Sequence, residues 1–231
     1  MPVSFRIHLR RLCALCSLAC IGLACAPFMI EYEGHKVFNP YYLFYLESHK
    51  RDAWQKPEEV VRALEIPPAA VVADIGAGGG YFTERFSRHL GSTGHVYATD
   101  VQEVMIQKLK DRVESRGLKN VEVIHAAFDE PMLPESSCDL VFFSSVYKEI
   151  SDRVNYMKKI AETLRPGGRV AIIEYRPYAL ALGPPLNFRM RRQQVVEELS
   201  AAGFVLIEEH DFLRREYFLV FSLSSISTVE N

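Results

Sequence analysis

Residues 71–81 constrain the fold of this chain more than any other stretch, because they run from an apolar strand through a glycine-rich turn into a helix. They read Val-Val-Ala-Asp-Ile-Gly-Ala-Gly-Gly-Gly-Tyr. Glycine permits positive φ and lets a ligand lie against bare backbone, while the free N–H groups at a helix N-terminus attract an anion. The turn therefore predicts a ligand site where the strand ends.

Strands and helices alternate along the chain around this turn. The expected strands are residues 70–75, 94–99, 121–126, 140–144 and 169–174, and the expected helices are residues 57–64, 81–90, 104–116 and 152–164. Such alternation favours a parallel sheet with right-handed crossovers. A last helix, 191–202, precedes two strands, 204–208 and 216–221, which are close enough in sequence to pair antiparallel at the edge. The chain is therefore predicted to hold one α/β domain.

The first 30 residues differ from the rest in composition. Residues 12–30 contain no charged side chain, and three arginines stand among residues 6–11. A basic flank followed by an apolar run is typical of a secretory signal or an N-terminal anchor. The positive-inside rule then places the following domain outside the cytoplasm, on the periplasmic side.

Three outcomes for this run remain open. Ala24-Cys25-Ala26 resembles a signal-peptidase cleavage site, and Leu-Ala-Cys, ending at Cys20 and again at Cys25, resembles the end of a lipoprotein box. The third outcome is an anchor, because 19 uncharged residues are enough to span a bilayer of about 30 Å. A start at Met29 would instead remove the run and leave a cytoplasmic protein. The expectation is an exported protein, or one attached to the membrane through residues 12–30.

Setting this run aside changes the charge balance. The full chain has 27 Lys and Arg and 29 Asp and Glu, and residues 1–30 hold three of the basic residues and none of the acidic ones. The remaining 24 basic and 29 acidic residues give a net charge of −5, which excludes a strongly basic nucleic-acid binder. Four of the five cysteines precede residue 26, so Cys138 has no partner for a disulfide within the domain.

An acid at the end of the second expected strand supports a nucleoside ligand. Asp100 closes the stretch His-Val-Tyr-Ala-Thr-Asp, 26 residues after Asp74. A carboxylate there is placed to accept both ribose hydroxyls. The dinucleotide fingerprint also needs a small residue where Tyr81 stands. Of the three functions considered for this chain, the sequence therefore favours a nicotinamide-dependent oxidoreductase least.

Residues 71–175 resemble a class I S-adenosylmethionine-dependent methyltransferase of the small-molecule type. The resemblance is carried by Asp-Ile-Gly-Ala-Gly-Gly-Gly at 74–80, Tyr-Ala-Thr-Asp at 97–100, Cys-Asp-Leu-Val-Phe at 138–142 and Leu-Arg-Pro-Gly-Gly-Arg at 164–169. Over residues 50–222 the chain is also similar to a bacterial subgroup that often carries an N-terminal signal. The resemblance implies a Rossmann-like sheet of seven mostly parallel strands, with one antiparallel edge strand and helices on both faces.

The expected organisation has four parts. They are a signal or anchor at 1–30, an aromatic and helical segment at 31–66, the methyltransferase domain at 67–222 and a flexible tail at 223–231. Aromatic residues crowd positions 38–54. They would either cover the acceptor pocket as a lid or pack against the edge of the sheet.

The resemblance implies S-adenosylmethionine as the cofactor and assigns residues to it. These are Asp74, Gly76, Gly78, Gly80, Asp100, Val101, Ala127, Asp129 and Ser144. The glycines would line the methionine and ribose side, Asp74 would lie near the methionine ammonium group, and Asp100 would bind the ribose hydroxyls. Val101 would pack on adenine. Relatives often carry an adenine-binding acid at the position of residues 126–127, so here backbone groups or Asp129 would hold adenine.

The acceptor is expected beyond the fourth and fifth strands. Relatives frequently have a His-His pair where Lys148-Glu149 stands. In its absence, Glu149 or Tyr147 would remove a proton and Lys148 would bind an anionic substrate, unless all three are ordinary loop residues. A second candidate set is Glu174-Tyr175-Arg176 at the end of the fifth strand. The sequence shows no metal-ligand spacing and no phosphate-loop motif.

The predicted function is methyl transfer from S-adenosylmethionine to a small-molecule acceptor. The alternative is a protein that binds this cofactor or its product without transferring a methyl group, because the Lys148-Glu149 loop is atypical. Nucleic acid is not an expected partner, and the oligomeric state stays open.

Overall fold

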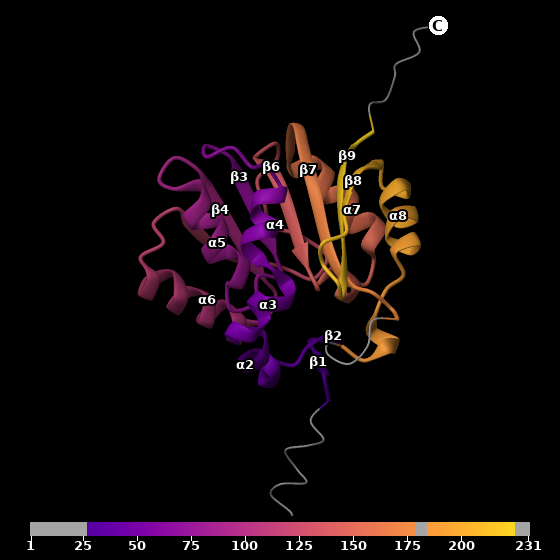
Figure 1. Cartoon of the computed structure of the whole chain (residues 1–231), viewed down its shortest axis with the longest axis horizontal. Helices are drawn as coiled ribbons and strands as arrows, with labels where there is room; N and C mark the ends of the chain where they lie inside the picture. The colour runs from indigo at the N-terminus through magenta and orange to yellow at the C-terminus, as the bar shows by residue number, and fades with distance from the viewer. Residues whose placement is uncertain (1–26, 179–183, 225–231) are drawn as a thin grey trace, which may run out of the picture.

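A seven-stranded sheet forms the centre of the computed structural model, which describes residues 27–178 and 184–224 (Figure 1). Its strands are β3 (Val71–Ile75), β4 (His95–Asp100), β5 (Val121–His125), β6 (Cys138–Ser144), β7 (Leu164–Tyr175), β8 (Phe204–His210) and β9 (Glu216–Leu223). The order across the sheet is β5-β4-β3-β6-β7-β9-β8. Six of the seven strands run in the same direction, and β9 runs in the opposite one.

This topology confirms the predicted Rossmann-like α/β fold and differs from the expectation in one detail. The antiparallel strand β9 lies one place in from the edge, because β8 takes the edge position. The helices are α4 (Pro57–Ala63), α5 (Tyr81–Leu90), α6 (Glu103–Arg116), α7 (Arg153–Thr163) and α8 (Arg192–Ala201). Each of these helices begins and ends within one residue of the bounds predicted from the sequence.

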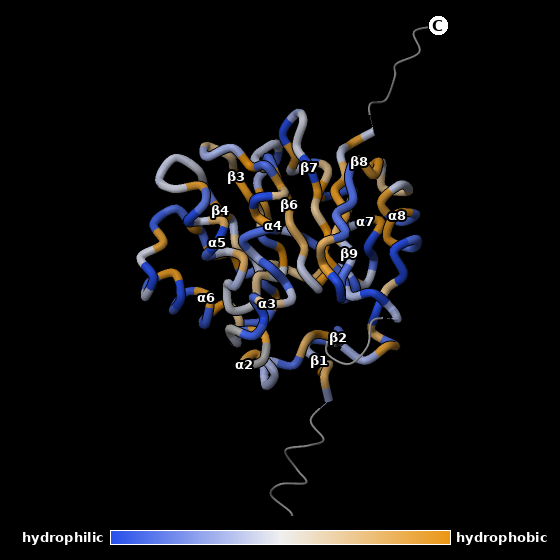
Figure 2. The backbone as a smooth tube through the Cα atoms, viewed as in Figure 1, coloured by the Kyte–Doolittle hydropathy of each residue, from blue (hydrophilic) through white to orange (hydrophobic). Residues whose placement is uncertain are grey.

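Helices cover both faces of the sheet, so its strands are apolar on both sides. Val72 and Phe142 pack on one face in a cluster with α4 and α5. Ile75, Val141 and Ile172 point to the opposite face and pack with α7 and α8. In Figure 2 the strands β3 and β6 are mainly hydrophobic, whereas α6 and α8 alternate between hydrophobic and hydrophilic residues. That alternation is typical of helices with one buried face.

The segment before α4, residues 27–55, is called the cap below. It begins with an antiparallel hairpin of β1 (Met29–Tyr32) and β2 (His35–Phe38), which the sequence analysis did not predict. Glu33 and Gly34 both have positive φ, 51° and 81°, as in the type I′ turn that joins tight hairpins. The hairpin includes Met29 and Ile30, the last two residues of the predicted leader.

Short helices continue the cap and cross the carboxyl ends of the parallel strands. They are η1 (Pro40–Tyr42), α2 (Leu43–Leu46), η2 (His49–Arg51) and α3 (Asp52–Gln55). In Figure 1 the hairpin and α2 lie below the sheet, in indigo. The cap therefore covers the edge of the sheet at which the glycine turn ends β3.

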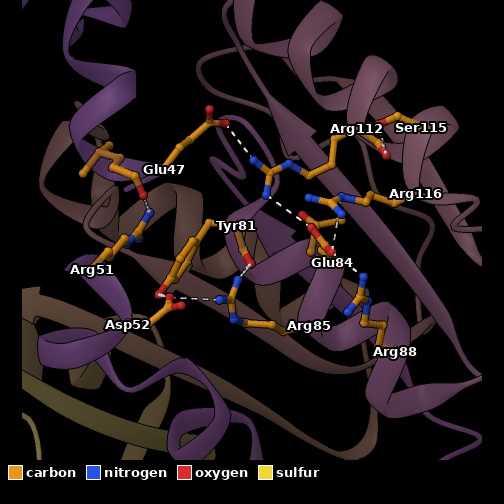
Figure 3. A network of polar contacts seen from close by, with 12 residues as sticks. Glu47, Arg51, Asp52, Tyr81, Glu84, Arg85, Arg88, Arg112, Ser115 and Arg116 are labelled. Atoms are coloured by element: carbon orange, nitrogen blue, oxygen red, sulfur yellow. Dashed lines mark hydrogen bonds and ion pairs between the residues drawn. The ribbon is translucent and has the colours of Figure 1, made fainter. Parts of the chain in front are cut away.

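Tyr81, the first residue of α5, fixes the cap to the domain (Figure 3). Its ring lies between two guanidinium groups, with Arg51 of the cap 3.8 Å and Arg85 4.0 Å from the ring centroid. Its hydroxyl donates to Asp52 Oδ1 at 2.5 Å, and Arg85 Nη2 lies 2.9 Å from the same oxygen. The residue that breaks the dinucleotide fingerprint thus has a structural role in this chain.

A second set of ion pairs joins the cap to α5 and α6 (Figure 3). Arg112 Nη2 lies 2.9 Å from Glu47 Oε1 in the cap, and its Nη1 lies 3.4 Å from Glu84 Oε2 in α5. Glu84 also pairs with Arg88 and Arg116. One half-buried guanidinium group therefore bridges the cap and two helices of the domain.

Candidate functional site

One cavity lies between the cap and the carboxyl ends of the parallel strands. It brings together nine of the twelve residues selected from the sequence, namely Asp74, Gly76, Gly78, Asp100, Val101, Ala127, Ser144, Lys148 and Glu149. The cap supplies an opposite wall that includes Phe38, Trp54 and Gln55. Ligand and acceptor candidates therefore face a single enclosed space.

Two glycines of the turn have different steric surroundings. Gly76 has φ +64°, and a Cβ atom there would approach Val146 Cγ2 to 2.3 Å, so no side chain fits. Gly78 has φ +57°, but a Cβ atom there would meet nothing within 4 Å. Because Gly78 lines the cavity, this open volume belongs to the space available for a ligand.

Gly80 has a different position from that expected. It is the N-cap residue of α5 and has φ +85°. A Cβ atom there would come within 2.7 Å of Leu109 Cδ1, so the glycine allows α6 to pack closely against the turn. Gly80 is not part of the cavity wall, whereas its neighbour Gly79 is.

Asp100 links the end of β4 to the glycine turn. Its Oδ2 accepts from the Gly78 N–H at 2.9 Å, and its Oδ1 accepts from the Gln102 N–H at 3.0 Å. Burial raises the pKa of Asp100, and these backbone donors oppose that shift. The carboxylate is thus held in one orientation at the cavity wall, and a carboxylate oxygen can accept further hydrogen bonds from a ligand hydroxyl.

Asp74 lies at the end of β3 and is almost fully buried. Thr83 Oγ1 donates to its Oδ2 at 2.6 Å. Burial raises the pKa of Asp74 to about 7, although the Thr83 hydrogen bond and the charge of Arg51 favour the ionised form. A buried carboxylate that lines the cavity can stabilise a cationic group of a ligand.

Besides Gly80, two predicted site residues lie outside the cavity. Tyr147 is fully buried in the core on the α7 side, and its hydroxyl donates to Glu198 Oε2 at 3.0 Å. Asp129 is exposed, and its carbonyl accepts from Lys159 Nζ at 2.7 Å. We therefore remove Tyr147 from the candidate proton acceptors and Asp129 from the candidate adenine contacts.

Glu149, the other candidate proton acceptor of this loop, lines the cavity. Its Oε2 accepts from the Phe38 N–H of β2 at 2.9 Å, and its Oε1 lies 3.7 Å from Lys148 Nζ. Burial raises the pKa of Glu149 to about 7, while the charge of Lys148 and the Phe38 N–H act in the opposite direction. A pKa near neutrality suits a general base.

The sequence analysis missed a buried polar network beside Ser144. Gln55 Nε2 lies 3.2 Å from Ser144 Oγ and 3.1 Å from Glu216 Oε1, and Arg51 Nε donates to Gln55 Oε1. Burial raises the pKa of Glu216 to about 8. Glu216 reaches this place because it pairs with Tyr175 across β7 and β9, a contact between residues far apart in sequence.

Aromatic side chains form much of the remaining wall. The rings of Trp54 and Tyr175 are 5.8 Å apart between centroids, and Phe28 contacts Phe38 at 5.3 Å. All four line the cavity, whereas Phe44 is exposed. For Phe38 and Trp54 the structure therefore favours the first of the two alternatives, a lid over the cavity.

The second candidate set, Glu174-Tyr175-Arg176, also has members inside and outside the cavity wall. Tyr175 lines the cavity, while Glu174 is fully buried outside its wall. Arg176 Nε donates to the Glu216 carbonyl at 2.9 Å instead of pairing with Glu174. Of these three residues, only Tyr175 can contact a ligand directly.

Two negative observations apply to residues 27–178 and 184–224. No group of three or more His, Cys, Asp or Glu side chains there could hold a metal ion. In the same ranges, no helix has the length and apolar character needed to cross a membrane. His125 Nε2 bonds to the Val101 carbonyl at 3.0 Å.

Sequence comparisons relate this site to one kind of enzyme. Residues 72–168 match a family model described as a methyltransferase domain. The ubiquinone/menaquinone biosynthesis C-methyltransferase UbiE of Vibrio campbellii is 29% identical over 109 residues, which cover 47% of this chain and 42% of the relative. A demethylmenaquinone methyltransferase of Bacillus mycoides is 29% identical over 128 residues, covering 55% and 52%. The chain thus spans about half the length of these curated relatives.

Solved structures share the fold. A SAM-dependent methyltransferase from Aquifex aeolicus superposes with a TM-score of 0.78 at 26% identity, covering 81% of this chain and all of that one. The [4+2]-cyclase SpnF superposes with a TM-score of 0.62 at 23% identity, covering 73% and 63%. The family match at residues 72–168 includes the glycine turn, Asp100 and Glu149. Residues 72–168 thus match a methyltransferase domain, and the fold is similar to that of S-adenosylmethionine-dependent methyltransferases.

Proposed function

We propose that this protein transfers a methyl group from S-adenosylmethionine to a small, largely apolar acceptor. The observation that carries the proposal is the single cavity in which Gly78 and Asp100 face the same space as Glu149 and Trp54. A cofactor at the glycine turn and an acceptor under the cap would therefore meet without crossing protein. Placing two reactants together in one enclosed site is the main contribution that a protein makes to such a reaction.

The residues present fit the cofactor. The open volume at Gly78 lets a ligand lie against the backbone, and Asp100 can accept hydrogen bonds from ribose hydroxyls. The buried carboxylate of Asp74 suits the methionine ammonium group. The cavity wall at Val101 and Ala127 leaves adenine to apolar and backbone contacts.

The cofactor, when bound, supplies a methyl group on a positively charged sulfur, and the bonding electron pair stays with that sulfur. Glu149 accepts the proton of the acceptor's O–H or N–H group as the methyl group reaches that atom. Trp54 and Tyr175 provide flat apolar surfaces on which an aromatic acceptor can rest. The cap excludes water from the reacting atoms.

The relatives' names support an apolar acceptor without naming the one used here. They describe a C-methyltransferase of ubiquinone/menaquinone biosynthesis and a demethylmenaquinone methyltransferase. The aromatic wall of the cavity agrees with a ring-containing acceptor of this general character. A different mode of action is a protein that binds the cofactor without transferring its methyl group, and a cyclase shares the fold.

Cofactor binding separates the candidate functions. S-adenosylmethionine and its demethylated product should each raise the melting temperature of the purified full chain, whereas NAD should not. Stabilisation by NAD alone would contradict the proposal and favour an oxidoreductase. The non-transferring binder predicts the same stabilisation as the methyltransferase but no labelled product.

Substituting Gly78 with alanine should weaken cofactor binding about 10- to 100-fold, because a methyl group would occupy the ligand space at a cost of about 1–3 kcal/mol. Gly117→Ala is the matched control, since Gly117 also has positive φ and open surroundings but caps α6 outside the cavity. Calorimetric titration with S-adenosylmethionine measures both. Equal losses in the two variants would mean that backbone strain, and not occupied ligand space, explains the effect.

Cofactor affinity should depend on pH through Asp74. Burial raises its pKa to about 7, and only the carboxylate attracts an ammonium group, so affinity is full above that pH and falls below it. Between pH 8 and pH 6 the ionised fraction changes about tenfold, and the association constant should fall by about the same factor. Asp74→Asn should bind more weakly and lack this part of the pH dependence. An unchanged pH profile in Asp74→Asn would assign the titration to another group.

We also propose that residues 12–30 export the protein or anchor it to a membrane. The end of this run belongs to the cap, because Met29 and Ile30 pair in the hairpin and Phe28 contacts Phe38 and Tyr42. The cap also carries the exposed side chain of Phe44. Fractionation of cells that express the full chain tests the proposal. Recovery in the membrane or exported fraction supports it, and recovery only in the cytosol contradicts it and favours a start at Met29.

A further inference from the structure

The ammonium group of Lys148 is surrounded by acceptors of the protein itself. Only 7% of the side chain is exposed, although it lines the cavity. Its Nζ donates to the Ser145 carbonyl and lies 3.5 Å from Glu174 Oε2 and 3.7 Å from Glu149 Oε1. An ammonium group has three donors, and three protein oxygens already face it. The charge of Lys148 is therefore balanced by two carboxylates of the protein, with which the anionic substrate suggested by the sequence would have to compete.

Both carboxylate oxygens of Glu174 contact Lys148. It is fully buried at the end of β7 and is not part of the cavity wall. Its Oε1 accepts from the Lys148 backbone N–H at 3.2 Å, and its Oε2 forms no hydrogen bond apart from the ion pair with Lys148 Nζ. One buried side chain thus fixes both the backbone and the charge of Lys148.

Ser145 has a strained backbone conformation, and a hydrogen bond from Lys148 helps to hold it. Ser145 has φ +61°, which costs a non-glycine residue about 1–2 kcal/mol. Its N–H donates to the Ile173 carbonyl at 2.8 Å, and its own carbonyl accepts from Lys148. These bonds offset the strain, and they keep the loop that carries Glu149 in one conformation.

We propose that Lys148 is a fixed counter-ion for Glu149, that Glu174 is the residue that positions it, and that the acceptor half of the cavity selects neutral acceptors carrying an O–H or N–H group. The selection follows from charge. A second anion beside Glu149 would have to compete with Glu149 and Glu174 for the same ammonium group, whereas a neutral hydroxyl can donate directly to Glu149. This inference rests on the proposed function, in which Glu149 accepts the acceptor's proton.

The charges around Glu149 predict that two substitutions shift its pKa in opposite directions. Lys148 of η3 (Tyr147–Glu149) and the Phe38 N–H of β2 lower its pKa, while Glu174 of β7 and Asp100 of β4 raise it. Lys148 and Glu149 also line a second groove. Its other charged residues are Glu31, His35, Lys36, Arg153 and Arg189. Lys148→Met should therefore raise the pKa of Glu149, and Glu174→Gln should lower it.

Carbon-13 NMR of glutamate carboxyl groups in the full chain measures this pKa without an acceptor or a cofactor. The resonance that titrates near neutrality and disappears in Glu149→Gln belongs to Glu149. We expect its pKa to rise by about 1 or more in Lys148→Met and to fall in Glu174→Gln. No change in Lys148→Met, or shifts of the same sign in both variants, would overturn the counter-ion role.

Lys148→Met leaves Glu174 buried without its partner, which can cost several kcal/mol of stability. Should that variant not fold, Lys148→Met/Glu174→Gln removes both charges together. The pKa of Glu149 should still rise in the double variant, because Lys148 affects Glu149 more strongly than Glu174 does. A pKa at or below that of the wild type would contradict the proposal.

Trp54 offers a direct test of acceptor charge, because it is the only tryptophan of the chain and lines the cavity. Benzyl alcohol and benzoate have similar size and differ in charge. Benzyl alcohol should change Trp54 emission saturably, and benzoate at the same concentrations should not. Saturable binding of benzoate that Lys148→Met abolishes would overturn the selectivity for neutral acceptors. Since neither assay needs S-adenosylmethionine, failure of cofactor binding would count against the proposed function alone.

Discussion

Replacing Asp100 with alanine is expected to weaken S-adenosylmethionine binding about 1,000-fold. Hydrogen bonds to a charged group contribute about 1.5–3 kcal/mol each, and a ribose diol would lose two of them. The carboxylate is also the group that orients the glycine turn through the Gly78 N–H and the end of β4 through the Gln102 N–H. Calorimetric titration of the full chain measures the loss.

Asp139→Ala is the matched control for this variant. Asp139 Oδ2 also accepts a backbone N–H, that of Val71 at 2.7 Å, but it lies at the opposite end of β3 and outside the cavity. The control should lose some stability and keep its affinity for the cofactor. If Asp100→Ala bound the cofactor as tightly as the wild type, the assignment of the cofactor to this half of the cavity would be wrong.

Glu149→Gln is expected to slow methyl transfer about 100- to 10,000-fold, the usual contribution of a positioned general base. The substitution preserves size and leaves an oxygen that can accept from the Phe38 N–H, but it cannot take up the acceptor's proton. Cofactor affinity should change little, because Glu149 lies on the cap side of the cavity beside Phe38. The initial rate of label transfer, measured with saturating labelled cofactor, gives the effect.

Glu198→Gln provides the comparison for catalysis. Glu198 is likewise a glutamate with a cationic partner near the same loop, but it contacts Arg153 and Tyr147 outside the cavity. Its transfer rate should remain close to that of the wild type. Equal rates for Glu149→Gln and the wild type would show that the acceptor loses its proton without help from Glu149.

Local sequence patterns predicted the central fold because its elements follow from local chemistry. The apolar run 71–75 and the glycines after it specify a strand and a turn wherever they occur. The acids Asp74 and Asp100 close neighbouring parallel strands, β3 and β4. Because parallel strands end at the same edge of a sheet, both carboxylates had to reach one site, and the structure has them in the same cavity wall.

The missing parts of the site depend on contacts between distant segments. Gln55 and Glu216 meet across 161 residues of sequence, and no local pattern indicates that a strand near the C-terminus brings a buried glutamate to this cavity. The hairpin at residues 29–38 was missed for a different reason. Its first strand continues an apolar run that is typical of a leader, so composition obscured the Glu33-Gly34 turn.

Tyr147 shows the limit of reading side-chain roles from a loop. Tyr147, Lys148 and Glu149 form one short 3-10 helix, in which consecutive side chains point in different directions. Tyr147 turns into the core, while Lys148 and Glu149 face the cavity. The sequence identified a loop that reaches the cavity, but only the tertiary structure separates the residues that line the cavity from the core residue.

The most direct test of a methyl transfer site under the cap is the fate of a labelled methyl group. The purified full chain, S-adenosylmethionine labelled in its methyl group and a small-molecule extract of the source cells are incubated together, and the products are separated by size. We predict label in a small, apolar product, which disappears with Asp100→Ala and falls sharply with Glu149→Gln. Tight cofactor binding without any labelled product across such extracts would contradict the account and leave a cofactor-binding protein.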